Sequence, residues 1–330
     1  MKYIASNTTM HTPKVFGWNL DSDNPVGLEY MILGKISGVS ANSVWDTLPL
    51  ELKQVMVSEI ADFIVQLFRL RFDTAGSLYT DDVGKQVVGP IIATPFYRAL
   101  DGWVRLDSST YRELASLRGP FTTVTEYLRS FLEAEIFLVR EYRQRILEHE
   151  LHGDEERLEL GRTVLGKAVE LCSLYPGEIC VSEPLTSPHS PFSIRLDDFR
   201  LSNIMIDEET GHVTGIIDFE GATVAPLWEC AYLPRWLQDY DEWDGSHEGG
   251  SAEDKQLLRD LFMRKIQELD PDGEWIRALE QGRPFREFTN LLSFNVGVWT
   301  NQEKWVRERL EWAKTHPGIA FPSEIDKALS

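Results

Sequence analysis

Apolar residues recur at helical spacing over two long stretches of the chain, and both are predicted to be core helices. Positions three and four apart are apolar across the first stretch, which gives one continuous stripe along a helix. That stripe consists of Leu52, Val55, Met56, Ile60, Phe63, Ile64, Leu67 and Phe68. A second stripe runs from Tyr127 to Val139 and ends in the charged run Arg140–Arg145, which we expect to be a solvated face. Most of the chain is therefore predicted to be helical.

The N-terminal part follows a different, strand-like pattern. Pro13–Trp18 and Leu28–Leu33 are rich in apolar and aromatic residues, and the polar turn Asp21–Pro25 separates them. Such a pattern predicts two strands joined as a hairpin. Residues 80–122 carry glycine, proline and short apolar runs, and we interpret them as an irregular insertion.

A third strand pattern begins at Phe192, where Phe192, Ile194 and Leu196 alternate as in a half-buried strand. A short loop follows and leads into a predicted hairpin. Its strands are expected over Ile204–Ile206 and Val213–Ile217, joined by the polar turn Asp207–His212.

Three oxygen-bearing side chains are predicted to gather at the open end of this hairpin. Asn203 begins the outgoing strand and Asp218 follows the returning one, so antiparallel pairing brings both to the same end. Asp198 lies in the loop that opens onto that end. Two carboxylates and an amide oxygen suit Mg²⁺, which keeps several waters and takes phosphate oxygens as further ligands. Taken alone, Asp198 is more typical of a turn former or a helix cap.

The pattern Asp198-x-x-x-x-Asn203 followed by Ile216-Ile-Asp-Phe-Glu220 resembles the aminoglycoside phosphotransferase group of kinase-like enzymes. The resemblance implies an α+β, protein-kinase-like two-lobed fold with a truncated β-rich small lobe and a mainly helical large lobe. Residues 1–36 would form the partial N-terminal lobe and hinge strand, and residues 37–330 the C-terminal catalytic lobe. Glu220 and the segment 222–231 also fit the family, and the resemblance spans nearly the whole chain.

The resemblance also implies a role for each matching residue. Asp198 would be the catalytic base that orients the acceptor hydroxyl, and Arg200 would lie near the transferred phosphate. Asn203 and Asp218 would hold the metal. Gly34 and Ile36 would bind adenine through backbone groups at the hinge, although an ordinary hairpin edge explains the same residues. The implied activity is a phosphotransferase with an alcohol group as acceptor, using ATP and Mg²⁺, with a nucleotide and a small-molecule acceptor as partners.

Two departures from the family pattern leave an alternative open. Leu196 stands where the family has a histidine that supports the loop backbone, and Asp197 replaces a small residue. Met1–Ser6 looks like the end of a small-lobe helix, and no lysine before residue 36 follows a glycine-rich strand turn. The expected consequence is that the strand near Leu28–Leu33 lacks the neighbours that normally cover its edge. The alternative function is therefore a pseudokinase or binding module without the phosphate-binding loop and lysine.

Composition and charge narrow the partners. The 330 residues include 53 Asp and Glu against 33 Lys and Arg, a net charge of −20, so binding to nucleic acid or to anionic membranes is not expected. An acidic cleft could attract a cationic acceptor, although the charge can equally serve solubility. Three widely spaced cysteines suit a reducing compartment, and the expected location is the cytoplasm. The acidic segment 238–251 could line an acceptor site or form a solvated loop.

Overall fold

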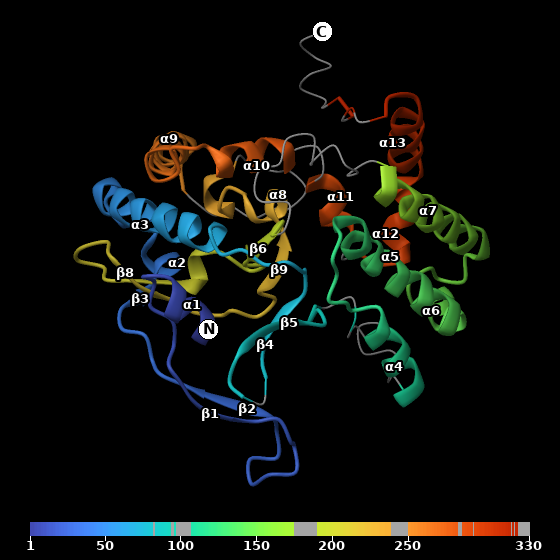
Figure 1. The fold of residues 1–330 in the computed structure, drawn as a ribbon, viewed down its shortest axis with the longest axis horizontal. Helices are drawn as coiled ribbons and strands as arrows, with labels where there is room; N and C mark the ends of the chain where they lie inside the picture. Colours follow the sequence, from blue (N-terminus) through green and yellow to red (C-terminus); the bar gives the residue numbers. More distant parts are fainter. Residues whose placement is uncertain are drawn as a thin grey trace. The chain divides into compact units, whose positions relative to one another are not determined.

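The chain divides into two compact units in the computed structural model (Figure 1). The structure describes residues 1–81, 83–93, 96, 107–174, 190–238, 250–282, 286–292, 294–317, 319 and 321–322. Unit 1 consists of Met1–Leu70, Ser193–Ala222 and Cys230–Ile276, and unit 2 of Arg71–Phe192, Thr223–Glu229 and Arg277–Ser330. These units follow a different division from the predicted boundary at residue 36, and that boundary stays a prediction.

Unit 1 contains all the residues predicted to form the site. Its helices are α1 (Lys2–Asn7), α2 (Ala41–Val44), α3 (Leu50–Phe68) and α9 (Ala252–Leu269), with the 3-10 turns η4 (Leu201–Asn203) and η5 (Arg235–Leu237). Its strands are β1 (Val15–Asn19), β2 (Tyr30–Leu33), β3 (Val39–Ser40), β7 (Ile204–Ile206) and β8 (Val213–Ile216). Strand β6 (Phe192–Arg195) and helices α8 (Leu227–Cys230) and α10 (Glu274–Gly282) cross the boundary between the units.

Both predicted hairpins of unit 1 form. Strand β1 pairs antiparallel with β2, and β7 lies between β3 and β8 in a second antiparallel sheet. The turn after β7 is closed by the Asp207 carboxylate, which accepts hydrogen bonds from the Glu209 and Thr210 amides at 3.0 Å each. Hydrogen bonds from Thr210 hold the pKa of Asp207 below its ordinary value. Strand β6 also forms, but the intervening Ser193 is buried as well, because its hydroxyl donates to the Leu67 carbonyl at 2.9 Å.

Helix α3 is the core helix that the apolar stripe predicts. Met56, Ile60 and Phe63 are each at most 1% exposed, and the helix packs against α9. One residue of the buried face is charged. Lys53 is only 5% exposed, and its ammonium lies 3.4 Å from the Asp254 carboxylate on α9 and 5.2 Å from the centre of the Trp45 ring. A buried ammonium needs such partners, because leaving it unpaired is costly.

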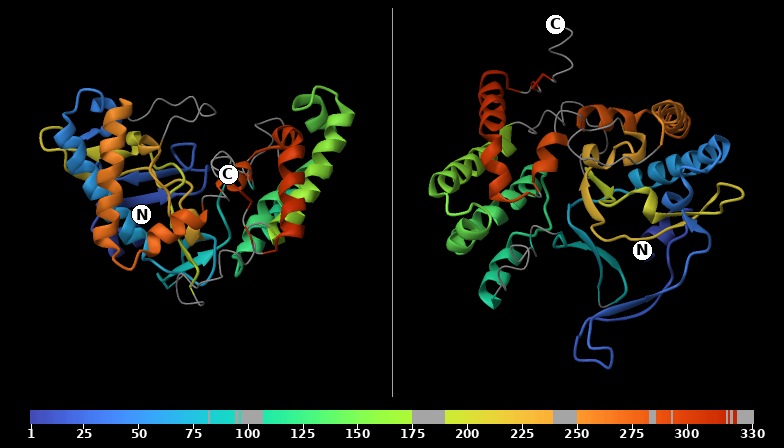
Figure 2. Two further views of the ribbon diagram at one scale, coloured as in Figure 1. Left: turned by 90° about the horizontal axis from the view of Figure 1, so that it is seen from above. Right: turned by 180° about the vertical axis from the view of Figure 1, so that it is seen from behind.

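Unit 2 is mainly helical in its described part. Its helices are α4 (Ser108–Ser116), α5 (Val124–Glu141), α6 (Arg143–His149), α7 (Glu155–Leu174), α11 (Arg286–Leu291), α12 (Val296–Trp299) and α13 (Glu303–Thr315), with the 3-10 turn η7 (Thr300–Gln302). Its strands are β4 (Ser77–Thr80), β5 (Gln86–Gly89) and β9 (Thr223–Pro226), and β4 pairs antiparallel with β5. Helix α7 packs against α5, α12 and α13, and Figure 2 shows α7 and α13 side by side in both views.

The stretch 80–122, interpreted above as irregular, contains regular structure. Strand β5 lies within it, and so does helix α4. Asp107 caps α4 by accepting hydrogen bonds from the amides of Ser109 and Thr110 at 2.8 and 2.9 Å. This cap marks where α4 begins. The glycines and prolines elsewhere in the stretch led to the interpretation of the whole segment as irregular.

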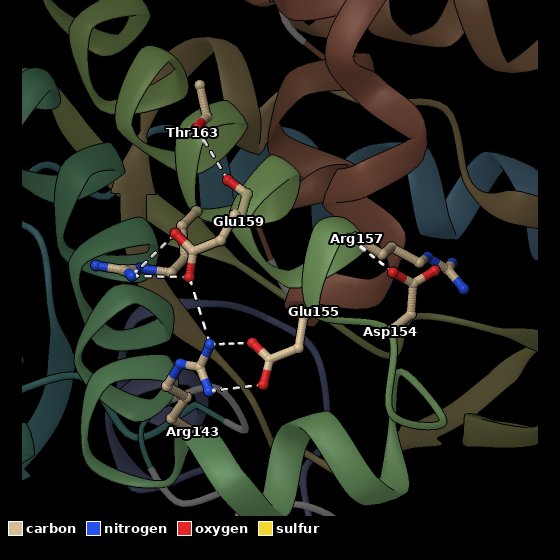
Figure 3. Close-up of polar contacts among 7 residues, drawn as sticks. Arg143, Asp154, Glu155, Arg157, Glu159 and Thr163 are labelled. Atoms are coloured by element: carbon tan, nitrogen blue, oxygen red, sulfur yellow. Dashed lines mark hydrogen bonds and ion pairs between the residues drawn. The ribbon is translucent and has the colours of Figure 1, made fainter.

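Ion pairs join α6 to the first turns of α7 (Figure 3). The Arg143 guanidinium pairs with Glu155 and lies 3.6 Å from a carboxylate oxygen of Glu159. Glu159 also accepts from Arg162 at 3.1 Å. The charged run 140–145 was expected to be a solvated face. Arg143 departs from that expectation, since it is paired with Glu155 and Glu159.

Neither membrane-spanning helices nor exposed thiols are found among the described residues. No helix in those ranges combines the length and the apolar character that crossing a bilayer requires. Cys172 and Cys230 are buried cysteines, and burial raises the pKa of the Cys172 thiol far above its ordinary value. Cys180 lies outside the described residues.

Two glycines should respond to alanine substitution with opposite signs. Gly211, in the β7–β8 turn, has φ 74°, and an added Cβ would lie 2.5 Å from the Leu52 carbonyl oxygen. We expect Gly211→Ala to lower the free energy of unfolding by about 1–3 kcal/mol, measured by urea titration. Gly166 lies in the middle of α7 on its solvent-exposed side, and no atom is near the position that a Cβ would take. Gly166→Ala should therefore raise the free energy of unfolding by about 0.5–1 kcal/mol. Equal effects at both positions would contradict this.

Candidate active site

The β7–β8 hairpin brings Asn203 and Asp218 to one end, as the strand pattern predicts. Ile204 pairs with Ile216, and one step further the Ile217 amide donates to the Asn203 carbonyl at 2.9 Å. Asp218 is the next residue. The two side chains therefore leave the backbone at neighbouring positions on adjacent chain segments.

Asp218 has an uncommon backbone conformation. Its φ is 58°, in the left-handed region that residues other than glycine seldom adopt, although Asp and Asn tolerate it better than most. One carboxylate oxygen accepts from the Glu220 amide at 3.3 Å. This conformation ends β8 and turns the chain immediately after the hairpin. Backbone strain of this kind is often found at functional sites.

The loop from Asp198 to Asn203 is closed by the Asn203 side chain. Its Nδ2 donates to the Asp198 carbonyl oxygen at 2.9 Å and to the Asp198 carboxylate at 3.2 Å. Both partners are acceptors, so the orientation of the amide is fixed and Oδ1 must point away from Asp198. Among the described residues, Oδ1 receives only a long contact of 3.4 Å from the Ser202 hydroxyl. The Asn203 oxygen therefore retains acceptor capacity although the residue is only 7% exposed.

Arg200 and Asp198 form an ion pair. The guanidinium Nη2 lies 2.7 Å from Oδ2 of Asp198, and both side chains are partly exposed. Oδ2 thus accepts from Arg200 and from Asn203, while Oδ1 is left for another donor. The carboxylate is fixed in orientation, as a group that positions a hydroxyl must be.

Two aromatic residues that the sequence patterns did not identify hold this loop in place. Phe199, between Asp198 and Arg200, is buried with its ring 6.2 Å from Phe63 on α3 and 5.5 Å from Trp236 on η5. Tyr232 donates its hydroxyl to the Leu196 carbonyl at 2.9 Å. Burial raises the pKa of Tyr232 well above its ordinary value, so it remains a donor at neutral pH. Leu196 itself is buried and apolar, and its carbonyl oxygen is held by the Tyr232 hydroxyl.

The predicted hinge residues line a separate cavity of unit 1. Gly34 and Ile36 border an open cavity of about 680 Å³, and none of Asp198, Asn203 or Asp218 lines it. The other lining residues are His11, Thr12, Lys14, Phe16, Lys35, Ser37, Val213 and Thr214. The Gly34 amide already donates to the Lys14 carbonyl at 2.7 Å, so it is not free to bind adenine. The adenine role of Gly34 and Ile36 stays a prediction.

The donor set fits a Mg²⁺ site that phosphate completes, rather than a metal cage built by the protein. In the ranges that the structure describes, no group of three or more His, Cys, Asp or Glu side chains could hold a metal ion. Mg²⁺ commonly takes only one or two carboxylates from the protein and fills its remaining positions with water and phosphate oxygens. One amide oxygen from Asn203 and one carboxylate from Asp218 meet that requirement. The acidic residues Asp239, Asp241, Glu242 and Asp244, considered above for an acceptor site, lie outside the described residues.

Comparison with known proteins assigns the family. The sequence profile described as "Phosphotransferase enzyme family" matches residues 2–279. The chain belongs to this family, which confirms the predicted kinase-like fold class and the resemblance to aminoglycoside phosphotransferases.

Curated relatives come from Aspergillus fumigatus. Subtelomeric hrmA-associated cluster proteins of two strains are 27% and 26% identical over 265 residues, which is 71% of this chain and 51% of each relative. The chain therefore spans about half the length of the curated relatives it matches.

Solved structures with a similar fold have lower sequence identity to this chain. An APH(2'') protein in complex with GDP and kanamycin is 15% identical with a TM-score of 0.36, over all of this chain and 80% of that one. An ADP-bound aminoglycoside phosphotransferase APH(2'') is 12% identical with a TM-score of 0.39, over 96% and 79% of the two chains. Similarity at this level carries no argument about function, and the family assignment rests on the sequence profile.

Removing the Tyr232 hydroxyl should weaken the loop in a pH-dependent way. Tyr232→Phe leaves the Leu196 carbonyl without this donor, and we expect a loss of about 1 kcal/mol in the free energy of unfolding at pH 7. Because the folded-state pKa of Tyr232 is raised, its stabilising effect is fully present below about pH 10 and is lost as the pH rises further. The difference between wild type and variant, measured by urea unfolding, should therefore shrink above about pH 10. A difference that grows with pH would contradict this assignment.

Proposed function

We propose that this protein transfers the γ-phosphoryl group of ATP to a hydroxyl of a small molecule, with Mg²⁺ assisting. Membership of the phosphotransferase enzyme family supports the reaction class. The observation that carries the finer proposal is the orientation of Asn203, whose Nδ2 is used by Asp198 while its Oδ1 is directed away from that residue. In the part of the chain that the structure describes, Oδ1 receives only the long contact from the Ser202 hydroxyl at 3.4 Å, which leaves it capacity for a metal ligand's role.

Asp198 is the residue proposed to act on the acceptor. Its Oδ2 is held by Arg200 and Asn203, so Oδ1 is the oxygen available to accept a hydrogen bond from the substrate hydroxyl. That hydrogen bond orients the nucleophilic oxygen toward the phosphoryl group. The Asp198 carboxylate takes the hydroxyl proton as the new P–O bond forms, while the bond to the β,γ-bridging oxygen breaks and ADP leaves. Positioning of this kind supplies much of the catalysis in phosphoryl transfer.

Arg200, Asn203 and Asp218 are proposed to act on the nucleotide. When Mg²⁺ is bound, it neutralises charge on the phosphate oxygens and holds them in line for transfer. Asn203 and Asp218 would supply its protein ligands from the end of the hairpin. The Arg200 guanidinium, 2.7 Å from Asp198, carries positive charge next to the position where the hydroxyl meets the phosphoryl group.

Substitution of Asp218 tests the metal assignment. Asp218→Asn keeps a residue that tolerates the left-handed conformation but removes the negative charge. We expect Mg²⁺-dependent ATP affinity, measured by calorimetry, to fall by at least about tenfold. Glu208→Ala removes an exposed carboxylate from the turn of the same hairpin and should leave the affinity unchanged. Wild-type affinity in Asp218→Asn would remove this residue from the metal site.

Substitution of Asp198 separates an enzyme from a pseudokinase. Asp198→Asn preserves size and hydrogen bonding but removes the proton acceptor, so turnover should fall by about 10²–10⁴-fold while ATP affinity changes little. The neighbouring Asp197, paired with Arg195 at 2.9 Å, offers the matched control Asp197→Asn, which should retain turnover. Phosphate release and acceptor phosphorylation across a panel of hydroxyl compounds provide the measurement. A wild type that binds ATP and Mg²⁺ without any turnover would support the pseudokinase instead.

A further inference from the structure

Strand β2 has an open edge on unit 1. The strand pairs with β1 on one side only, and all four of its residues are exposed. Figures 1 and 2 show the β1–β2 hairpin extending away from the β3–β7–β8 sheet and from α3. Exposed apolar side chains are unusually dense here, with Trp18, Met31 and Ile32 each more than half exposed. An exposed apolar edge strand is a template for pairing with another strand.

The backbone shows which groups of β2 face the open edge. The Gly34 amide donates to Lys14, next to β1, at 2.7 Å. Backbone groups of an extended strand alternate in direction, so those of Ile32 and Tyr30 also face β1. The amides and carbonyls of Met31 and Leu33 therefore point to the open edge, where no strand of the described chain pairs with them.

We propose that this edge pairs with the same edge of a second copy of the chain, antiparallel about a twofold axis at Ile32. In this register Met31 lies opposite Leu33 of the second copy, and both direct their backbone groups to the shared edge. A register shifted by a single residue would oppose an outward-facing residue to an inward-facing one, so the ladder could not form.

Charge complementarity selects this register. Glu29 and Lys35 flank the strand, and pairing about Ile32 places Glu29 of each chain directly opposite Lys35 of the other. Two opposite-charge pairs thus form at the ends of the shared ladder, and no like charges face each other. Both residues are exposed, and no ion pair of either is found within the described chain. Because the two ends of the strand carry opposite charges, two antiparallel copies of it are complementary to each other.

Side-chain size supports the same arrangement. Tyr30 lies opposite Gly34, which carries no side chain that could clash with the tyrosine ring. Ile32 faces its symmetry mate at a position where the backbones approach most closely, with about 4.5 Å between Cα atoms. The product is a four-stranded antiparallel sheet in the order β1, β2, β2, β1, which is more stable than an isolated two-stranded hairpin. Its small interface implies a concentration-dependent dimer.

Charge reversal tests the register. Wild type should show a mass that rises toward twice that of one chain with concentration, measured by light scattering after size exclusion. Glu29→Lys and Lys35→Glu each place like charges at both ends of the ladder, and either should weaken dimerisation by about tenfold or more. The double variant restores both pairs and should recover the dimer. Asp23→Lys makes the same charge change in the turn between β1 and β2, outside the ladder, and should dimerise like wild type.

A cysteine at the axis gives an independent measurement on the folded chain. Ile32→Cys brings two thiols within disulfide range, since the expected Cα separation lies within the roughly 4.4–6.8 Å that a disulfide needs. Mild oxidation should therefore yield a covalent dimer. Tyr30→Cys, which faces Gly34 of the second copy rather than itself, should yield little. A wild type that stays monomeric at every concentration, or equal crosslinking of the two variants, would overturn the proposal.

Discussion

The hydrogen bonds from the Asn203 amide to Asp198 organise the whole candidate site. They join the loop to the residue that precedes β7, and they orient the Asn203 amide and the Asp198 carboxylate together. Because both acceptors belong to Asp198, the amide has one permitted orientation and its oxygen is directed away from that residue. Arg200 adds a second donor to the same carboxylate. These contacts thereby separate the Asp198 oxygen that we propose for the acceptor from the Asn203 oxygen that we propose for the metal.

The residues that hold the Asp198–Asn203 loop in place are mainly apolar. Phe199 inserts its ring between α3 and η5, while the strands of the hairpin pack through Ile204 and Ile216, both at most 1% exposed. Packing of this density holds the loop backbone so that short polar side chains can be fixed without long hydrogen-bond networks. The Tyr232 hydroxyl is the one polar support described above, and it reaches a carbonyl at the start of the loop.

Local sequence patterns predicted the parts of this arrangement that depend on neighbouring residues, but not the contacts between residues far apart in the sequence. Apolar runs on either side of a polar turn indicated β7 and β8, and antiparallel pairing across that turn placed Asn203 and Asp218 at the same end. Tyr232 lies 36 positions from Leu196, and no periodicity indicates such a contact. The burial of Lys53 was equally hidden, because a lysine within an apolar stripe is usually assigned to the solvated side. Helix α4 was missed because its start depends on one capping aspartate rather than on a long apolar stripe. The left-handed backbone of Asp218 has no signature in an Ile-Ile-Asp-Phe sequence.

The buried ammonium of Lys53 limits how α3 and α9 can slide along each other. Apolar stripes repeat every three or four residues, so two helices that meet through such stripes alone can bury similar areas at several offsets. Lys53 meets the Asp254 carboxylate, in the first turn of α9, at only one of those offsets. Another offset would separate the buried ammonium from this carboxylate, and leaving a buried charge without its partner is costly. The pair thus favours one relative position of the two helices. It holds the start of α9 against α3, the helix that carries Phe63 beneath the Asp198 loop.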